Sequence, residues 1–95
     1  MDAYVKLAYD AIEYYLEKKT YLREFDEKFK EKSNGIRIEV KINERLKGIS
    51  GSIYPTRENL ALDIIFEAVN AGFFDFKFNP ISKENLKDLE IKVFE

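Results

Sequence analysis

The feature that most constrains this fold is a stretch in the second half of the chain, Arg57–Gly72, which is apolar on two sides. Read as a helix, its first line of apolar side chains consists of Leu60, Ala61, Ile64, Ile65, Ala68, Ala71 and Gly72. A second apolar line consists of Leu62, Phe66, Val69 and Phe73. The polar stripe between the two lines consists of Asn59, Asp63, Glu67 and Asn70. Because a surface helix needs only one apolar face, this helix must be covered from two sides.

The N-terminal third of the chain predicts one long helix and one shorter helix. Residues 2–19 carry a helical apolar stripe of Met1, Tyr4, Val5, Ala8, Ala11, Ile12, Tyr15 and Leu16. Asp2 suits the N-cap of this helix and can also pair with Lys6 one turn later. Part of the segment 21–32 is expected to form a short helix that ends at Ser33-Asn34-Gly35, where glycine permits a left-handed backbone.

The middle of the chain predicts a β-hairpin. Ile36–Ile42 alternates apolar and charged residues strictly, which is typical of a half-buried antiparallel strand. A turn at Asn43-Glu44-Arg45 leads to a return strand, Leu46–Tyr54. Gly48 and Gly51 interrupt this strand, and glycine inside a strand usually marks a bulge or a close approach of two backbones.

The remaining segments complete an α+β fold. Thr56 is a candidate N-cap of the two-sided helix. An irregular aromatic connection, Phe73–Pro80, leads to a helical turn capped by Ser82 and then to a strand, Leu89–Phe94. We therefore expect a single domain, residues 1–95. Its antiparallel sheet, made of the hairpin and the C-terminal strand, is expected to pack against the N-terminal helix and the central helix.

Composition excludes several kinds of function. The sequence contains no cysteine and no histidine, so it cannot supply a disulfide, a thiolate nucleophile or a Ser-His-Asp relay. No dense acidic cluster marks a metal site, and no cofactor is expected. The 16 basic and 18 acidic residues are interleaved, so nucleic-acid binding is not expected. No apolar run reaches the roughly 18 residues of a membrane span, and no signal-peptide pattern is present, which predicts a cytoplasmic protein without a membrane partner.

The sequence resembles the AMMECR domain family in four ordered segments. The family's Leu-Arg-Gly-Cys-Ile-Gly motif reads Leu46-Lys47-Gly48-Ile49-Ser50-Gly51 here, and the Pro55-Thr56 pair follows it. The Asp-x-Arg-Phe-x-Pro motif reads Asp75-Phe76-Lys77-Phe78-Asn79-Pro80, and the last strand motif falls on Leu86–Val93. The resemblance covers most of this chain but only about half of the family domain.

Departures from the family pattern affect the functional interpretation. The family's motif cysteine, a suspected active or binding residue, aligns with Ile49, and its neighbouring isoleucine aligns with Ser50. The two motif arginines are Lys47 and Lys77 here, and a lysine does not reproduce the planar fork of arginine. The resemblance therefore implies an AMMECR-like protein that lacks the family's reactive thiol, and we assign it no catalytic residue.

Three classes of function remain open. The first is a non-catalytic interaction or scaffold module. The second is a small-ligand or anion-binding domain built on Lys47, Gly48, Ile49, Ser50, Gly51, Asp75 and Lys77, where glycines admit a ligand to the backbone and lysine holds an anion. The third, an enzyme or enzyme subunit, needs a carboxylate in a cleft, with candidates Glu44, Asp63 and Asp75. The structural alternatives are a glycine-bent strand and an aspartate that bonds backbone amides.

The resemblance also suggests where a partner binds. Since the matched region is only half of the family domain, we expect the second apolar line of the central helix to lack part of its usual cover. An exposed row of large apolar side chains is typical of an interaction surface. We therefore predict a homodimer, or a separate second-half protein as partner, that docks on Leu62, Phe66, Val69 and Phe73.

Overall fold

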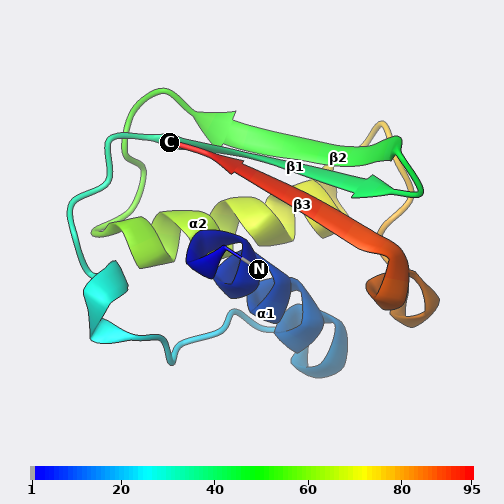
Figure 1. Cartoon of the computed structure of the whole chain (residues 1–95), viewed down its shortest axis with the longest axis horizontal. Coiled ribbons are helices and arrows are strands. Elements are labelled where there is room, and N and C mark those ends of the chain that lie inside the picture. The colour runs from blue at the N-terminus through cyan, green and yellow to red at the C-terminus, as the bar shows by residue number, and fades with distance from the viewer. Residues whose placement is uncertain (1) are drawn as a thin grey trace.

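The three strands of this computed structural model, which describes residues 2–95, form one antiparallel sheet in the order β2-β1-β3, and the helices cover one face of it (Figure 1). The strands are β1 (Ile36–Ile42), β2 (Arg45–Ser52) and β3 (Leu89–Phe94). The α-helices are α1 (Ala3–Lys18) and α2 (Leu60–Val69). Three shorter helical segments are η1 (Glu27–Phe29), η2 (Asn70–Phe74) and η3 (Lys83–Asp88). The predicted α+β fold is confirmed.

The hairpin follows the predicted alternation. The four apolar residues of β1 are buried against the helices, and the charged residues between them lie on the open face of the sheet. The connecting turn contains only two residues, Asn43 and Glu44, because Arg45 already belongs to β2. Both turn residues have positive φ, at 51° and 69°, as the tight turns that fit the twist of a hairpin require. The predicted three-residue turn is therefore one residue too long.

Helix α1 begins at the predicted cap. The Asp2 carboxylate accepts hydrogen bonds from the backbone N–H groups of Tyr4, at 2.8 Å, and Val5, at 3.3 Å. The predicted pairing of Lys6 with Asp2 is wrong, because the carboxylate is engaged in the cap. Lys6 instead pairs with Asp10, at 3.0 Å, on the next turn. Met1, predicted to start the apolar stripe, lies outside the described residues.

The segment between α1 and β1 contains much less helix than predicted. It has no regular secondary structure except for the single turn η1, which brings Phe29 into the core. The Tyr4 ring lies 5.6 Å from the Phe29 ring, and the Tyr4 hydroxyl donates to the Glu31 carboxylate at 3.0 Å. This hydrogen bond raises the pKa of the Tyr4 hydroxyl. Gly35 has the predicted left-handed conformation, with φ of 97°, but it precedes a strand and does not end a helix.

Helix α2 begins later than predicted, at Leu60, and its α-helical part ends at Val69, before the predicted end at Gly72. Asn59 caps it, accepting a hydrogen bond from the N–H of Leu62 at 3.0 Å, and Arg57 lies outside the helix. Thr56 is not the cap, because its hydroxyl and its N–H both donate to Asp63. At the other end, the π-helical turn η2 continues the helical backbone past Gly72 to Phe74.

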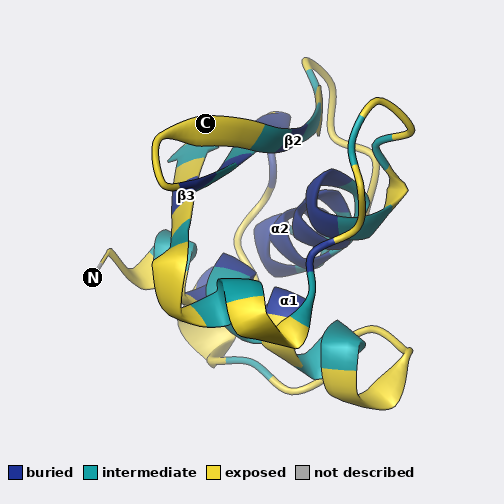
Figure 2. Cartoon of the chain, turned by 90° about the vertical axis from the view of Figure 1, so that its right-hand side faces the viewer, coloured by how far each residue is buried: buried dark blue, intermediate teal, exposed yellow. Residues whose placement is uncertain are grey.

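The chain itself supplies most of the cover that α2 needs. The helix packs against β1, β2 and α1, and Figure 2 shows it largely buried. On the second apolar line Phe66 lies between the Arg57 guanidinium, 3.6 Å from its ring centre, and the Tyr21 ring, 6.1 Å away. Val69 on this line is fully buried, so it belongs to the core and is unavailable to a partner. Leu62, Phe66 and Phe73 are half-buried, and for these three the predicted interface remains a prediction.

Segment η3 follows its predicted cap residue, Ser82. Its backbone N–H and its hydroxyl both donate to the side-chain oxygen of Asn85, each at 2.9 Å. The turn leads directly into β3, which pairs with β1 in the register Ile42↔Leu89 to Arg37↔Phe94. The predicted C-terminal strand is confirmed.

Candidate functional site at β2 and α2

The motif residues Lys47, Gly48, Ile49, Ser50 and Gly51 all lie within β2, which is an edge strand of the sheet. The structure also brings the predicted Asp75 to this strand. Its carboxylate accepts from the N–H of Ile49 at 3.2 Å and from the N–H of Lys77 at 3.2 Å. The Lys77 side chain is exposed, and within residues 2–95 no ion pair joins it to Asp75. Asp75 therefore bonds backbone amides, as the structural alternative proposed.

Gly48 marks both a bulge and a close approach of two backbones. The register between β1 and β2 shifts at this point, since Val40 pairs with Gly48 and Lys41 pairs with Leu46. Lys47 is therefore the extra residue of a bulge. A Cβ atom on Gly48 would overlap the carbonyl oxygen of Ala71 in η2, so only glycine fits there. The two predicted roles of this glycine are confirmed together.

The two acidic residues of the polar stripe, Asp63 and Glu67, face inward. The Ser50 hydroxyl donates to the Glu67 carboxylate at 2.6 Å, and Glu67 is only 4% exposed. One turn earlier Asp63, 1% exposed, accepts from the hydroxyl of Thr56 at 2.9 Å and from its N–H at 3.3 Å. Among residues 2–95 the second carboxylate oxygen of Asp63 has no hydrogen-bond partner. These bonds attach α2 to β2 and to the loop that follows β2.

Sequence reasoning did not single out Glu67. A signal was present, because Asp63 and Glu67 are four residues apart and share one face of a helix that is otherwise apolar. Two acids on the covered face of such a helix need donors from a neighbouring element. Ser50 and Thr56 are those donors. As a result, the Ser50 hydroxyl is engaged in a buried bond to Glu67, and the other acidic candidate, Glu44, lies exposed in the hairpin turn.

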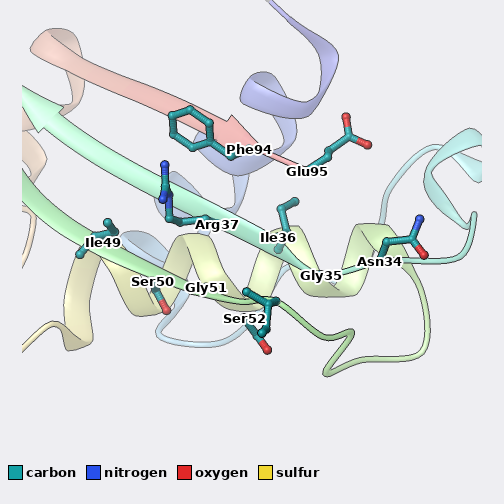
Figure 3. A pocket seen from close by; sticks show the side chains of 11 residues that line it. Asn34, Gly35, Ile36, Arg37, Ile49, Ser50, Gly51, Ser52, Phe94 and Glu95 are labelled. Atoms are coloured by element: carbon teal, nitrogen blue, oxygen red, sulfur yellow. The ribbon is translucent and has the colours of Figure 1, made fainter.

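The open face of the sheet carries a shallow hollow of about 740 Å³. Its lining includes Ile49, Gly51, Arg37 and Phe94, and the Arg37 guanidinium lies 4.4 Å from the centre of the Phe94 ring. Figure 3 shows Ile49, Arg37 and Phe94 projecting to one side of the sheet, whereas Ser50 projects to the other. Three of the seven predicted site residues, Ile49, Ser50 and Gly51, border this hollow.

Within residues 2–95 no three acidic side chains are grouped as metal ligands. Across the same residues, each helix is too short or too polar to cross a bilayer.

Comparison with known proteins identifies the family of this chain. The family model of AMMECR1 matches residues 5–94. The chain belongs to the AMMECR1 family. A Clostridium acetobutylicum protein is 31% identical over 97% of this chain, which corresponds to 20% of that protein. A Thermotoga maritima protein is 34% identical over 72% of this chain and 39% of its own length. The resemblance predicted from the sequence is confirmed.

A solved structure shares the fold of this chain. The crystal structure of the uncharacterized protein PH0010 from Pyrococcus horikoshii matches with a TM-score of 0.84 and 23% identity. The match covers 95% of this chain and 47% of PH0010. This AMMECR1 chain thus spans less than half the length of each of these three relatives. Ile49, which the resemblance alone aligns with the motif cysteine, faces the hollow, while Ser50 faces α2.

Proposed function

We propose that this AMMECR1-family chain is a non-catalytic protein-interaction module that acts in the cytoplasm. The observation that carries the proposal is the exposure of two phenylalanines beside β2, since Phe76 is 94% exposed and Phe74 is 55% exposed. Large exposed aromatic side chains are enriched at protein interfaces, where they bury much surface at little entropic cost. We call this pair the β2-side aromatic pair.

The backbone that carries the aromatic pair is attached to β2 through Asp75. Phe74 and Phe76 flank Asp75, whose carboxylate bonds the backbone of Ile49 in β2. Phe74 also contacts the Tyr15 ring of α1, with ring centres 5.8 Å apart. A rigidly presented aromatic surface loses little conformational freedom when a partner binds. Asp75 is engaged by the backbone of Ile49 and Ser50 by the Glu67 carboxylate, and this internal bonding favours binding over catalysis.

The partner that fits best is a polypeptide with the sequence of the rest of an AMMECR1 domain. The relatives extend well beyond the matched region, which supports the proposal that an AMMECR1 domain has further segments outside this chain. Such a segment would cover the aromatic pair either within one chain or from a separate one. The predicted partner, a second-half protein, is thereby retained, but its contact surface moves from the α2 line to Phe74 and Phe76.

Site-specific crosslinking in the native cell tests this proposal. A photo-crosslinking phenylalanine analogue at position 76 should give an adduct with one AMMECR1-type polypeptide, whereas the analogue at Tyr14 on α1 should not. Phe76→Ser should abolish the complex and change the free energy of unfolding by less than about 0.5 kcal/mol, because the ring is exposed. Equal adducts at both positions, or a complex that survives Phe76→Ser, would contradict the proposal.

The hollow on the open face supports a second candidate function, the binding of a small anion. Its lining combines the Arg37 guanidinium with the backbone of Gly51, and Lys47 and Lys77 are not part of it. Titration with inorganic phosphate, followed by amide NMR, should then shift Gly51 and its neighbours at submillimolar concentrations. Arg37→Gln should remove the shifts. Shifts that are unchanged in Arg37→Gln, or absent from the wild type, would eliminate this function.

A further inference from the structure

The two edges of the sheet differ in how open they are. On β2 the register is broken by the bulge at Lys47, and the outward N–H of Ile49 is occupied by Asp75. Bulges and capped peptide groups are features that block the addition of another strand. Strand β3 has neither feature. It lies in unbroken register with β1 and contains no glycine or proline.

The outer peptide groups of β3 are free of bonds to the rest of the chain. From Glu90 to Phe94, no residue among 2–95 outside the sheet makes a hydrogen bond with the strand. Figure 1 shows β3 as an outer strand of the sheet, on the side where α1 lies. A flat strand edge with unpaired N–H and C=O groups is a template for one more strand.

The sequence of β3 is complementary to itself. In an antiparallel pair, residues directly opposite each other point to the same face of the sheet. If two copies of β3 pair about Ile91, then Glu90 of each copy lies opposite Lys92 of the other on the open face. On the helix-covered face Leu89 lies opposite Val93, and Ile91 lies opposite itself. Opposite charges and apolar pairs across strands both stabilise a sheet.

Neighbouring registers are unfavourable. A shift by one residue would place the apolar side chains of one copy on the charged face of the other. Pairing about Lys92 or about Glu90 would place two like charges directly opposite each other. Within the chain, β3 already forms the favourable charge pairs, with Lys92 opposite Glu39 and Glu90 opposite Lys41 on β1.

We infer that two copies of this chain join edge to edge through β3 and form one continuous six-stranded antiparallel sheet. The inference is independent of the proposed function, because the β2-side aromatic pair lies beyond the opposite edge of the sheet. It assigns the predicted homodimer to β3, in place of the apolar line of α2.

Charge reversal gives a test with opposite outcomes for a dimer and for a merely structural effect. Glu90→Lys places like charges opposite each other twice in the dimer and should raise the dissociation constant about tenfold. The double variant Glu90→Lys with Lys92→Glu restores opposite charges between the copies and should restore the wild-type constant. Inside each chain the double variant destabilises the sheet more than the single variant does, since it creates two like-charge pairs with β1. If the effect is purely structural, the double variant should therefore dimerise more weakly than Glu90→Lys alone.

The measurements are sedimentation velocity over a concentration series and amide hydrogen exchange of the full chain. The wild type should dimerise, and the outward-facing amides of β3 should become protected as the concentration rises. Glu24→Lys, on an exposed segment, and Phe76→Ser should leave the dimer unchanged. A wild type that stays monomeric, a dimer insensitive to Glu90→Lys, or β3 amides that are protected only when another polypeptide is added would overturn the inference.

Discussion

Gly48→Ala is expected to lower the free energy of unfolding by at least about 3 kcal/mol, a large share of the stability of a small domain. The added Cβ would overlap the carbonyl oxygen of Ala71, which is a backbone atom and cannot move aside as a side chain can. Strand β2 and segment η2 would have to separate, and the bulge at Lys47 would be lost with them. Urea unfolding followed by circular dichroism measures the effect.

Gly72→Ala, only one residue beyond Ala71, is the matched control. Its Cβ would lie 3.5 Å from a side-chain carbon of Ile81 and 3.6 Å from Ile12, which are ordinary van der Waals contacts. Alanine also favours helical backbone over glycine by about 1 kcal/mol. This variant should therefore be neutral or slightly stabilising. Equal losses in the two variants would show that the backbone contact at Gly48 is not the reason for its glycine.

Ser50→Ala is expected to cost about 2–4 kcal/mol, because it leaves the buried Glu67 carboxylate without its hydrogen-bond donor. The loss should be much greater than that of Ser52→Ala, a neighbouring serine on the same face of β2. The Ser52 hydroxyl only accepts a bond from the exposed N–H of Tyr54, at 3.1 Å. The measured quantity is again the free energy of unfolding in urea.

A double variant separates the cost of an unpaired charge from the cost of lost packing. Ser50→Ala combined with Glu67→Met replaces both polar partners by apolar groups of similar size, and such exchanges are often nearly neutral. It should recover most of the stability that Ser50→Ala loses. If the double variant is less stable than Ser50→Ala alone, the Ser50–Glu67 bond is not what makes the single change costly.

Predictions that depended on long periodic stretches agree with the structure, whereas the short helix expected within 21–32 is reduced to the single turn η1. The strict alternation of Ile36–Ile42 fixes which side chains face the core, and β1 has the predicted bounds. The caps at Asp2 and Ser82 are also local, since each side chain bonds groups only two or three residues away. In such segments neighbouring residues supply both partners of every interaction, so the pattern alone is sufficient.

Predictions that required the partner of a polar group were less successful. Thr56 was predicted as a helix cap, but the carboxylate of Asp63 takes its hydroxyl, and Asn59 caps the helix instead. Lys6 was assigned to Asp2, although the cap had already engaged that carboxylate. In each case the sequence offers two possible partners for one polar group at similar distances along the chain. Which partner forms the bond depends on how α2 or α1 packs.

By itself, the sequence determined the α+β class, the hairpin, both long helices, the C-terminal strand and membership of the AMMECR1 family. Only the tertiary structure decided that the acids of α2 face inward and that Asp75 reaches Ile49, 26 positions away in the chain. It also decided that Val69 belongs to the core and that β3 is the open edge. The physical reason is that periodicity fixes the face on which a side chain lies, whereas chain folding fixes what that face meets.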